Sequence, residues 1–408
     1  MNKKLMALAV AGALGAPAAA MAQNYSIYGR LTLGVDSYEA KGATAGAAAD
    51  FTKRARVFDN GSRVGFRGTE DLGGGVQAVF LIESGVNVDN GSTTGQGGQT
   101  NTSTGNWGSR TGYVGLAGSI GRVTYGRDNV WWGNGAIEQV GANWLNAGAQ
   151  LYSGSFGRGM SVGITRQSNL MQYTSPTFSG VNFVVSVSPS AAEAQPAGTN
   201  ADGQLIGITA QGTHGPFAWG IDYVQDKGNT PNAGGPKQTT GTGTKIRVGY
   251  RYMPAGQISL LSVATEKENF ASGAATQPTG LVAACNTATG CSLEQAGVGF
   301  SWDHMFGPFN PIVQYYTIDK ISGSGCTGTV CDNTGAKQIT VALRYIFSKR
   351  THAYVSYNKI DNEIAYNQDF NGASLTSRTG ATSTAFPAGT QAVGADPTII
   401  AIGLMHNF

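Results

Sequence analysis

The sequence predicts an all-β chain that closes into a transmembrane, antiparallel up-and-down β-barrel of about 16 strands. Three observations predict this fold. Apolar side chains recur at every second position through segments of about ten residues, short and long links between these segments take turns, and no stretch of roughly 18 consecutive apolar residues follows residue 22. A period of two is that of a β-strand, whose successive side chains point to opposite faces.

Residues 1–22 have the organisation of a secretory signal peptide. Lys3 and Lys4 precede an uncharged apolar run, and the segment closes with Ala20, Met21 and Ala22, a small-residue cleavage pattern. We therefore expect export with cleavage near residue 22, and residues 23–408 as a single transmembrane β-barrel domain.

The composition is unusual for a soluble exported protein. Charged residues make up 12% of the chain, about half of the usual share, and glycine accounts for 61 of 408 residues. Without Lys3 and Lys4, 25 basic residues face 24 acidic ones, a net charge of +1. This near-neutral balance argues against nucleic acid as a partner.

Four cysteines lie in two close pairs, Cys285 with Cys291 and Cys326 with Cys331. Four cysteines allow three pairings, among which the sequence does not choose. In an oxidising compartment we expect local disulfides in two separate loops. No histidine lies near either pair and the spacings differ from those of zinc sites, so we expect no metal.

The two faces are clearest in residues 244–252, where alternate side chains are apolar or basic. The apolar face carries Ile246, Val248, Tyr250 and Tyr252, and the opposite face carries Lys245, Arg247, Gly249 and Arg251. Applied along the chain, this pattern predicts strands near 24–38, 53–70, 75–88, 108–118, 121–128, 159–175, 181–189, 204–213, 217–227, 244–253, 257–268, 293–305, 309–319, 336–347, 351–362 and 397–408.

The links between these strands favour a membrane barrel over a soluble sandwich. Short links at 71–75, 253–256, 306–309 and 348–351 take turns with long polar ones at 87–106, 227–243, 269–292 and 362–396. Hydrocarbon offers the backbone no hydrogen-bond partners, so a sheet can cross it only by closing on itself. The apolar face then contacts lipid, and the polar face lines a lumen that sixteen strands make wide enough for water.

Six stretches resemble the Gram-negative general porins, particularly those of the β-proteobacterial type. They are "YSIYGRLTLGVD", "GSRVGFRGTEDLGGGVQAVFLIESG", "GYVGLAGSIGRVTYGRD", "YTSPTFSGVNF", "RYIFSKRTHAYVSYNKI" and the closing "GLMHNF". The resemblance implies a homotrimer of sixteen-stranded barrels in the outer membrane, reached through the periplasm, that passes small hydrophilic solutes and ions without catalysis or cofactor. It also implies contact with outer-membrane lipid and lipopolysaccharide, and recognition of Phe408 by the assembly machinery. The alternative is a substrate-specific channel for sugars or organic acids.

The resemblance also implies a constriction formed by the third loop, which folds into the barrel. The alternation lapses between Arg127 and about Gly159, and this stretch is rich in glycine and asparagine. The candidate constriction residues of this loop are Asp128, Trp131, Trp132, Glu138 and Trp144. An outward surface loop is the alternative, which three clustered tryptophans disfavour.

The family places a basic wall opposite that loop. Matched motifs and strand parity assign to it Arg30, Arg63, Arg67, Arg127 and Arg166. Arg110 stays unassigned because the phase of its segment is ambiguous. Alternation places Arg127 on the face of Val123 and Tyr125, so its luminal assignment depends on the family match or on a local β-bulge. Asp128 and Glu138 are the only acids between Arg127 and Arg166. The excess of basic charge predicts a preference for anions.

An enzyme finds little support in the sequence. The four histidines, His214, His304, His352 and His406, belong to no nucleophile motif. We therefore expect no catalytic residues.

Overall fold

The computed structural model describes residues 24–86, 88–89, 107–130, 160, 166–189, 203–231, 238–252, 256–270, 291–326, 329, 331–370 and 392–408. Residues 1–22 lie outside these ranges, so the signal peptide stays a prediction. In the described ranges, no helix has the length and apolar character needed to span a membrane.

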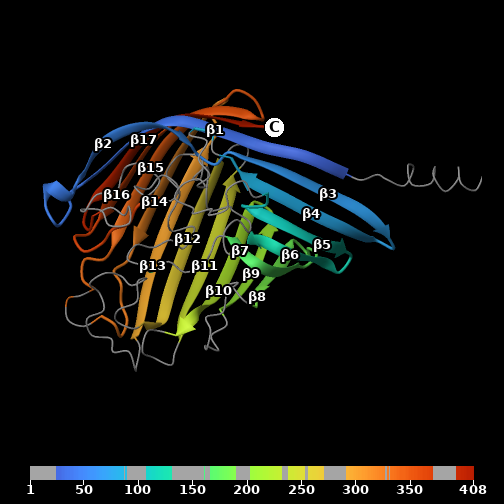
Figure 1. Cartoon of the computed structure of the whole chain (residues 1–408). Helices are drawn as coiled ribbons and strands as arrows, with labels where there is room; N and C mark the ends of the chain where they lie inside the picture. Colours follow the sequence, from blue (N-terminus) through green and yellow to red (C-terminus); the bar gives the residue numbers. More distant parts are fainter. Residues whose placement is uncertain are drawn as a thin grey trace, which may run out of the picture.

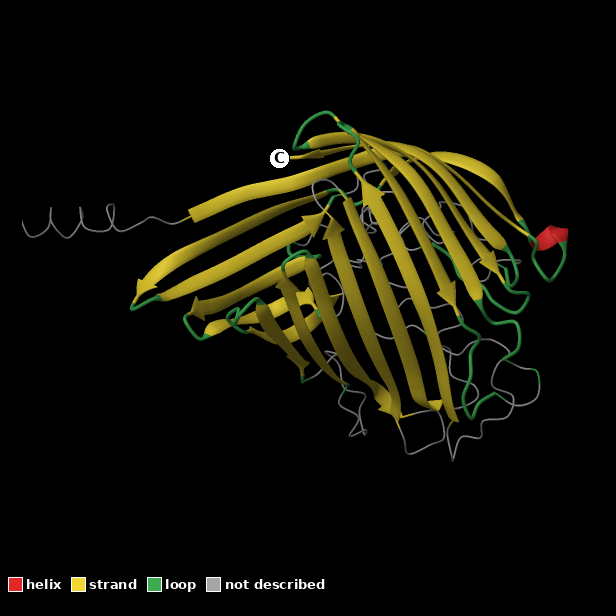
Figure 2. Cartoon of the chain, turned by 180° about the vertical axis from the view of Figure 1, so that it is seen from behind, coloured by secondary structure: helices red, strands yellow, loops and turns green. Residues whose placement is uncertain are grey.

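Strands dominate the described chain, and the short 3₁₀ helix η1 (Ala47–Ala49) stands out at one tip of the molecule (Figures 1 and 2). The strands are β1 (Asn24–Lys41), β2 (Phe51–Asp59), β3 (Arg63–Gly73), β4 (Val76–Gly85), β5 (Thr111–Gly118), β6 (Gly121–Asn129), β7 (Arg166–Thr174), β8 (Val181–Ser188), β9 (Gln204–His214), β10 (Phe217–Pro231), β11 (Gln238–Tyr252), β12 (Gly256–Phe270), β13 (Cys291–His304), β14 (Phe309–Ile318), β15 (Ala336–Ile346), β16 (Thr351–Asn362) and β17 (Asp396–Asn407).

The sheet closes on itself. From β3 to β17 each strand pairs antiparallel with the next, and β17 pairs with β1 from Arg30↔Asn407 to Lys41↔Asp396. The other edge of β1 pairs with β3 over Asn24–Arg30 and with β2 over Leu33–Ala40. β2 and β3 are therefore two halves of one barrel strand, which the sequence predicted as 53–70. The described fold is a closed 16-stranded antiparallel barrel, as predicted.

The interruption between β2 and β3 has a local cause. The carboxylate of Asp59 accepts the backbone N–H groups of Gly61 and Ser62, at 3.0 and 2.9 Å, and Gly61 has a φ of 109°. These side-chain to backbone bonds replace ladder bonds and turn the chain. A side chain at Gly61 would strain this conformation.

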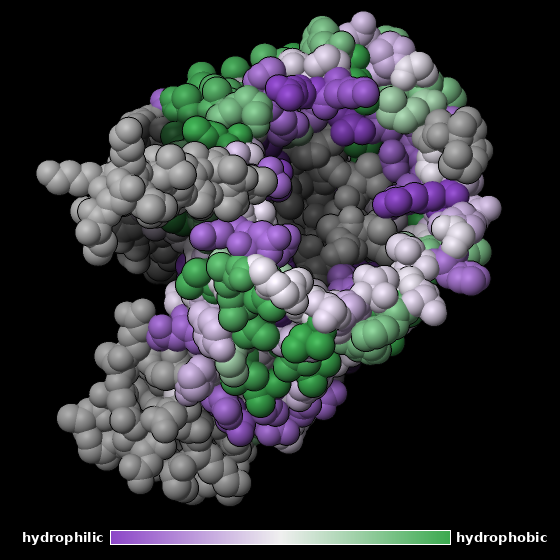
Figure 3. Space-filling view, turned by 90° about the vertical axis from the view of Figure 1, so that its right-hand side faces the viewer, coloured by the Kyte–Doolittle hydropathy of each residue, from purple (hydrophilic) through white to green (hydrophobic). Residues whose placement is uncertain are grey.

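The two faces of the strands have the predicted polarity. In β15, Ile339, Val341 and Leu343 are exposed, whereas Thr340 and Ala342 between them are buried. Figure 3 shows hydrophilic side chains bordering a hollow and hydrophobic side chains on the outer side of the wall. The apolar face therefore points outward and the polar face inward, the reverse of a soluble barrel.

Short turns occupy one end of the barrel and longer links the other. His214 to Phe217, His304 to Phe309 and Ile346 to Thr351 are turns of a few residues at the end where β1 begins and β17 stops. The prediction of a long loop at 227–243 is wrong, because β10 and β11 continue to pair through Lys227↔Thr240 to Pro231↔Gln238. The polar composition of this stretch concealed two strand extensions.

The chain end completes the closure. Phe408 donates its N–H to the carbonyl of Gly29 at 3.1 Å and accepts the N–H of Gly29 at 3.0 Å. Its ring lies over Gly29, where an added Cβ would meet the ring and also the carbonyl oxygen of Arg63 at 2.7 Å. Because Gly29 has no side chain, the ring of Phe408 can pack against β1 at the seam of the barrel.

We expect Gly29→Val to destabilise the folded barrel, because the new side chain forces Phe408 away from β1. Overpacking of this kind costs about 1–3 kcal/mol. The urea midpoint of unfolding in detergent, followed by the heat-modifiable mobility of the barrel, should fall. Ser37→Val on the outward face of the same strand is the control and should leave the midpoint unchanged; equal effects of both changes would contradict the closure role.

Candidate functional site

Five arginines gather on the luminal wall, on the loop side of the barrel's middle. They are carried by β1, β3, the residue before β5, β6 and β7, and we call them the arginine cluster: Arg30, Arg63, Arg110, Arg127 and Arg166. Arg30 lies directly opposite Arg63 in the β1–β3 ladder. The charge of Arg166 interacts with those of Arg63, Arg110 and Arg127. Four of the five are among the arginines that the sequence assigned to the wall.

Glu83 of β4 holds one side of the cluster together. Its Oε1 accepts a hydrogen bond from Nε of Arg110 at 2.9 Å, and its Oε2 lies 3.5 Å from Nε of Arg63. The hydroxyl of Tyr28 donates to Oε2 at 3.0 Å. One carboxylate therefore orients two guanidiniums and a phenol, and charge-assisted bonds of this type are stronger than neutral ones.

Arg30 depends on the interruption between β2 and β3. Its Nε and Nη2 both donate to the carbonyl of Gly61, at 3.1 and 3.0 Å. This carbonyl is available because the chain leaves the ladder at Gly61. Arg30 thus keeps its full charge while its position is set by a backbone oxygen instead of a carboxylate.

Arg127 reaches the cluster through a β-bulge. The β6–β7 register shifts between Gly126 and Asp128, and Gly126 has a φ of 146°. Nε of Arg127 donates to the carbonyl of Ser109 at 3.1 Å, and Nη1 donates to Oγ of Ser168 at 2.8 Å. Simple alternation would have turned Arg127 outward with Tyr125, which is 56% exposed. The bulge that the sequence required for an inward Arg127 is present.

Arg110 is the member of the cluster that sequence reasoning left unassigned. It precedes β5 in a turn, and its N–H bonds to the carbonyl of Glu83 at 3.0 Å, which brings its guanidinium to the Glu83 carboxylate. Because it lies outside the strand, parity could not place it. Glu83, the acidic residue on the neighbouring strand β4, was the sequence feature that could have indicated a luminal Arg110.

Arg67 lies apart from the cluster. It has the luminal parity of Arg63, but its Nε donates to Oγ of Ser26 at 3.0 Å and its guanidinium stacks over the ring of Tyr28, 5.2 Å from the centroid. It is four residues nearer the short turns than Arg63 and has no contact with Glu83.

The charge balance of the cluster is positive in the described part of the chain. Its five guanidiniums interact with three carboxylates: Glu83, Asp59 near Arg30, and Asp128 near Arg166. The difference is 5 − 3, a net charge of +2. The prediction that Asp128 belongs to the third loop is wrong, because it lies in β6 and pairs with Gln167 of β7, on the same wall as the arginine cluster.

The chain after β6 turns toward the interior. Val130 and Met160 are 3% and 0% exposed and belong to the same buried interior cluster. Val130 packs against the inward face of Gly207 in β9, three strands away from β6. Trp131, Trp132, Glu138 and Trp144 lie outside the described residues. At its two described positions, this segment contacts the inside of the barrel, in agreement with an inward loop.

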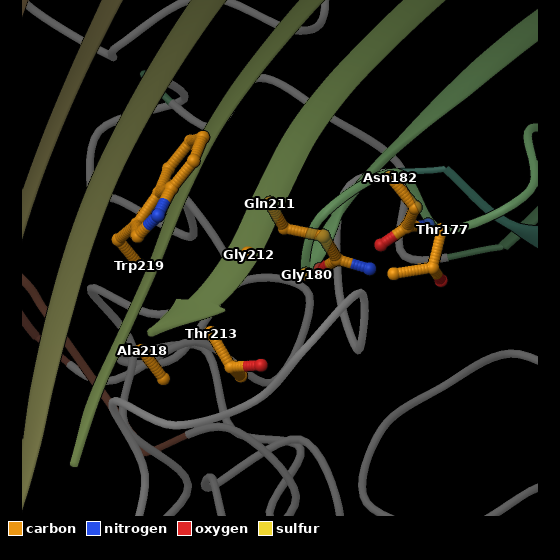
Figure 4. Close-up of a pocket in the computed structure, with 8 residues that line it drawn as sticks. All are labelled: Thr177, Gly180, Asn182, Gln211, Gly212, Thr213, Ala218 and Trp219. Atoms are coloured by element: carbon orange, nitrogen blue, oxygen red, sulfur yellow. The ribbon is translucent and has the colours of Figure 1, made fainter. Parts of the chain in front are cut away.

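A separate hollow of about 250 Å³ lies near the short turns of β8, β9 and β10 (Figure 4). The amide side chains of Gln211 and Asn182 lie close to Thr177, while Trp219 stands apart on the other side of β9. Oε1 of Gln211 accepts a hydrogen bond from Nη2 of Arg247 at 2.9 Å. None of the eight lining residues is charged, so this hollow differs in chemistry from the arginine cluster.

The described residues offer no group of three or more His, Cys, Asp or Glu side chains placed to hold a metal ion. Cys326 and Cys331 form a local disulfide in the link after β14. Cys285 lies outside the described residues, so a bridge to Cys291 stays a prediction.

Comparison with known proteins adds family evidence. The model of a family described as Gram-negative porin matches residues 7–365. Major outer membrane protein P.IB of Neisseria lactamica is 28% identical over 374 residues, covering 87% of this chain and 92% of that protein. An outer membrane porin protein of Bordetella pertussis is 34% identical over 206 residues, 47% of this chain and 49% of that one.

Among solved structures, the anion-selective porin from Comamonas acidovorans superposes with a TM-score of 0.63, at 20% identity, over 95% of this chain and all of that one. At this identity the likeness shows the shared fold.

A designed disulfide tests the inward turn after β6. A Cβ at Gly207 would lie 3.8 Å from Cβ of Val130, the usual separation in a disulfide. We expect Val130→Cys with Gly207→Cys to cross-link in the folded protein, detected as a linked peptide by mass spectrometry. Val130→Cys with Ala218→Cys, at the turn end of the same wall, should stay unlinked; cross-linking of both pairs, or of neither, would contradict the packing.

Proposed function

The chain belongs to the Gram-negative porin family, and from this premise we propose that its channel prefers anions to cations. Porins of this family lie in the outer membrane and let small hydrophilic solutes and ions diffuse passively, and this chain is such an outer-membrane channel. The residues at the narrowest part of the lumen decide whether anions or cations pass more readily.

The net charge of the arginine cluster carries the proposal. Five guanidiniums share three carboxylates, and only Arg63 and Arg110 contact Glu83 directly. Arg30 and Arg127 are held by carbonyl and hydroxyl oxygens, which orient a guanidinium without cancelling its charge. Arginine stays protonated under all ordinary conditions.

The physical effect is electrostatic. Fixed charges beside a low-dielectric wall act across a narrow aqueous section, where a unit charge a few ångströms away contributes about 1 kcal/mol even in water-like surroundings. An anion passing the cluster is stabilised and a cation is repelled. The predicted third-loop residues Trp131, Trp132, Glu138 and Trp144 would narrow the section opposite, and Arg67 would extend the basic wall toward the short turns.

A substrate-specific channel is the second candidate, and the uncharged hollow beside Gln211 and Asn182 favours it, since amides and hydroxyls suit neutral hydrophilic solutes. Saturable block of the ion current by a sugar would support this function. Current that falls only in proportion to solute size would support general diffusion.

We further propose that the protein works as a homotrimer surrounded by outer-membrane lipid and lipopolysaccharide, with Phe408 read by the assembly machinery. The family supports the trimer, and the position of Phe408 at the barrel seam fits a residue that reports completed closure. Closure of the current in three equal steps in a planar bilayer would support a trimer; a single step would contradict it. We propose no catalytic activity.

Removing two cluster charges should weaken the anion preference. We expect Arg63→Ala with Arg166→Ala to lower the anion-to-cation permeability ratio by roughly tenfold, since about 1.4 kcal/mol corresponds to that factor. Reversal potentials across a salt gradient measure the ratio. Lys349→Ala with Arg350→Ala, in an exposed short turn, removes the same charge outside the lumen and should leave it unchanged. A cation preference of the unmodified channel would defeat the proposal.

Removing the central carboxylate should act in the opposite direction. Glu83→Gln leaves Arg63 and Arg110 without their acid, so the permeability ratio should rise several-fold in the same measurement. Glu70→Gln, on the outward face of β3, is the matched control. If Glu83→Gln left the ratio unchanged or lowered it, the cluster would not control selectivity.

A further inference from the structure

Two further arginines face the lumen between the arginine cluster and the short turns. Arg67 lies on β3 and pairs through Leu81 of β4 with Tyr113 of β5. Arg122 lies on β6, where it opposes Ala117 of β5 and so shares the inward face of Tyr113. We call Arg67 and Arg122 the turn-side arginine pair. Four adjacent strands therefore bring both side chains toward one part of the wall.

An aromatic ring positions each guanidinium of the pair. Arg67 stacks over Tyr28 at 5.2 Å from the ring centroid, and Arg122 stacks over Tyr113 at 5.7 Å. The charges of both arginines also act on the hydroxyl of Tyr113, as does the charge of Asp128. Stacking uses the flat face of a guanidinium and leaves its N–H groups at the edge free to bind oxygen.

One described carboxylate acts on the pair: the charge of Asp128 interacts with Arg122, so two guanidiniums face one acid. Within the described ranges, neither Arg67 nor Arg122 forms an ion pair, and the only hydrogen bond of Arg67 is to Ser26. The carboxylate of Asp128 also accepts the N–H of Asn129 at 2.7 Å, which orients it and leaves its charge in place. By contrast, Lys245 and Arg247 on the far wall both pair with Asp222, at 3.6 and 3.1 Å.

We propose that the turn-side arginine pair is a binding site for small divalent oxygen anions, of which dicarboxylates are the best match. Each guanidinium can take one carboxylate through two parallel N–H bonds, which a point charge cannot do. The hydroxyl of Tyr113, whose ring stacks with Arg122, would add a further hydrogen-bond donor. A monocarboxylate engages only one guanidinium and binds correspondingly more weakly.

The site gives the channel a second anion position after the cluster. Binding at this site depends on the proposed anion preference only for solutes that enter from the loop side. A dianion added at the short turns reaches Arg67 and Arg122 without passing the arginine cluster. Addition from the turn side therefore tests the pair by itself.

The experiment is a single-channel recording in a planar bilayer with chloride as the carried anion and succinate or propionate added on the turn side. Succinate should reduce the chloride current in a saturable manner, and propionate should require at least tenfold more to reach the same reduction. Arg67→Gln with Arg122→Gln should raise the succinate concentration for half-block at least tenfold, and Tyr113→Phe several-fold. Arg251→Gln, a luminal arginine near the turn end of β11 that bonds to Gln257, is the matched control and should leave it unchanged.

Each outcome decides between the two proposals. Retained block in Arg67→Gln with Arg122→Gln, an equal effect of propionate, or no block in the unmodified channel would overturn the site, whatever the reversal potential. Loss of anion preference in Arg63→Ala with Arg166→Ala, while turn-side succinate still blocks, would support both proposals separately. A cation preference with succinate block intact would overturn the anion preference alone. Heat-modifiable mobility confirms that every variant is folded.

Discussion

The hydrogen-bond ladder that closes between β1 and β17 is the interaction on which the rest of this protein depends. In hydrocarbon an unpaired N–H or C=O group costs several kcal/mol, so a sheet of this size is admissible only without an edge. Twelve residue pairs from Arg30↔Asn407 to Lys41↔Asp396 form this seam, and the Gly29–Phe408 bonds extend it to the chain end. The lumen and the side chains that line it depend on this closed ring of strands.

Closure also inverts the usual distribution of side chains. The outward positions of β15 and β17 carry Ile339, Val341, Ile400 and Ile402, which are exposed because lipid replaces a protein core. Inward positions carry polar and charged groups, which in a lumen can meet both water and each other. The few charged side chains of this protein can therefore be concentrated on the luminal face, where solutes pass. The low overall charge content reflects the apolar side chains of the lipid-facing surface.

The arginine cluster is built from departures from regular structure. Arg30 is held by a carbonyl exposed at the β2–β3 interruption, Arg127 is turned inward by the bulge at Gly126, and Arg110 belongs to a turn. A regular barrel would offer only every second residue of each strand to the lumen. Local irregularity places additional guanidiniums at one level of the wall, as β-bulges commonly do near functional sites.

The sequence by itself determined the fold class, the sixteen barrel strands with most of their bounds, and the outward and inward faces, because a period of two is a local property that each strand carries. Four of the five cluster arginines were also assigned from the sequence, but Arg127 only through its matched motif, since alternation alone would turn it outward. Only the tertiary structure decided that residues 53–70 form two segments and that β10 and β11 extend past Lys227. It also decided that Arg110, Glu83 and Tyr28 meet, and that Arg67 lies with Arg122 nearer the short turns. These features depend on register between strands that are distant in the chain. Register is set by the closure of the whole ring, which no local pattern contains.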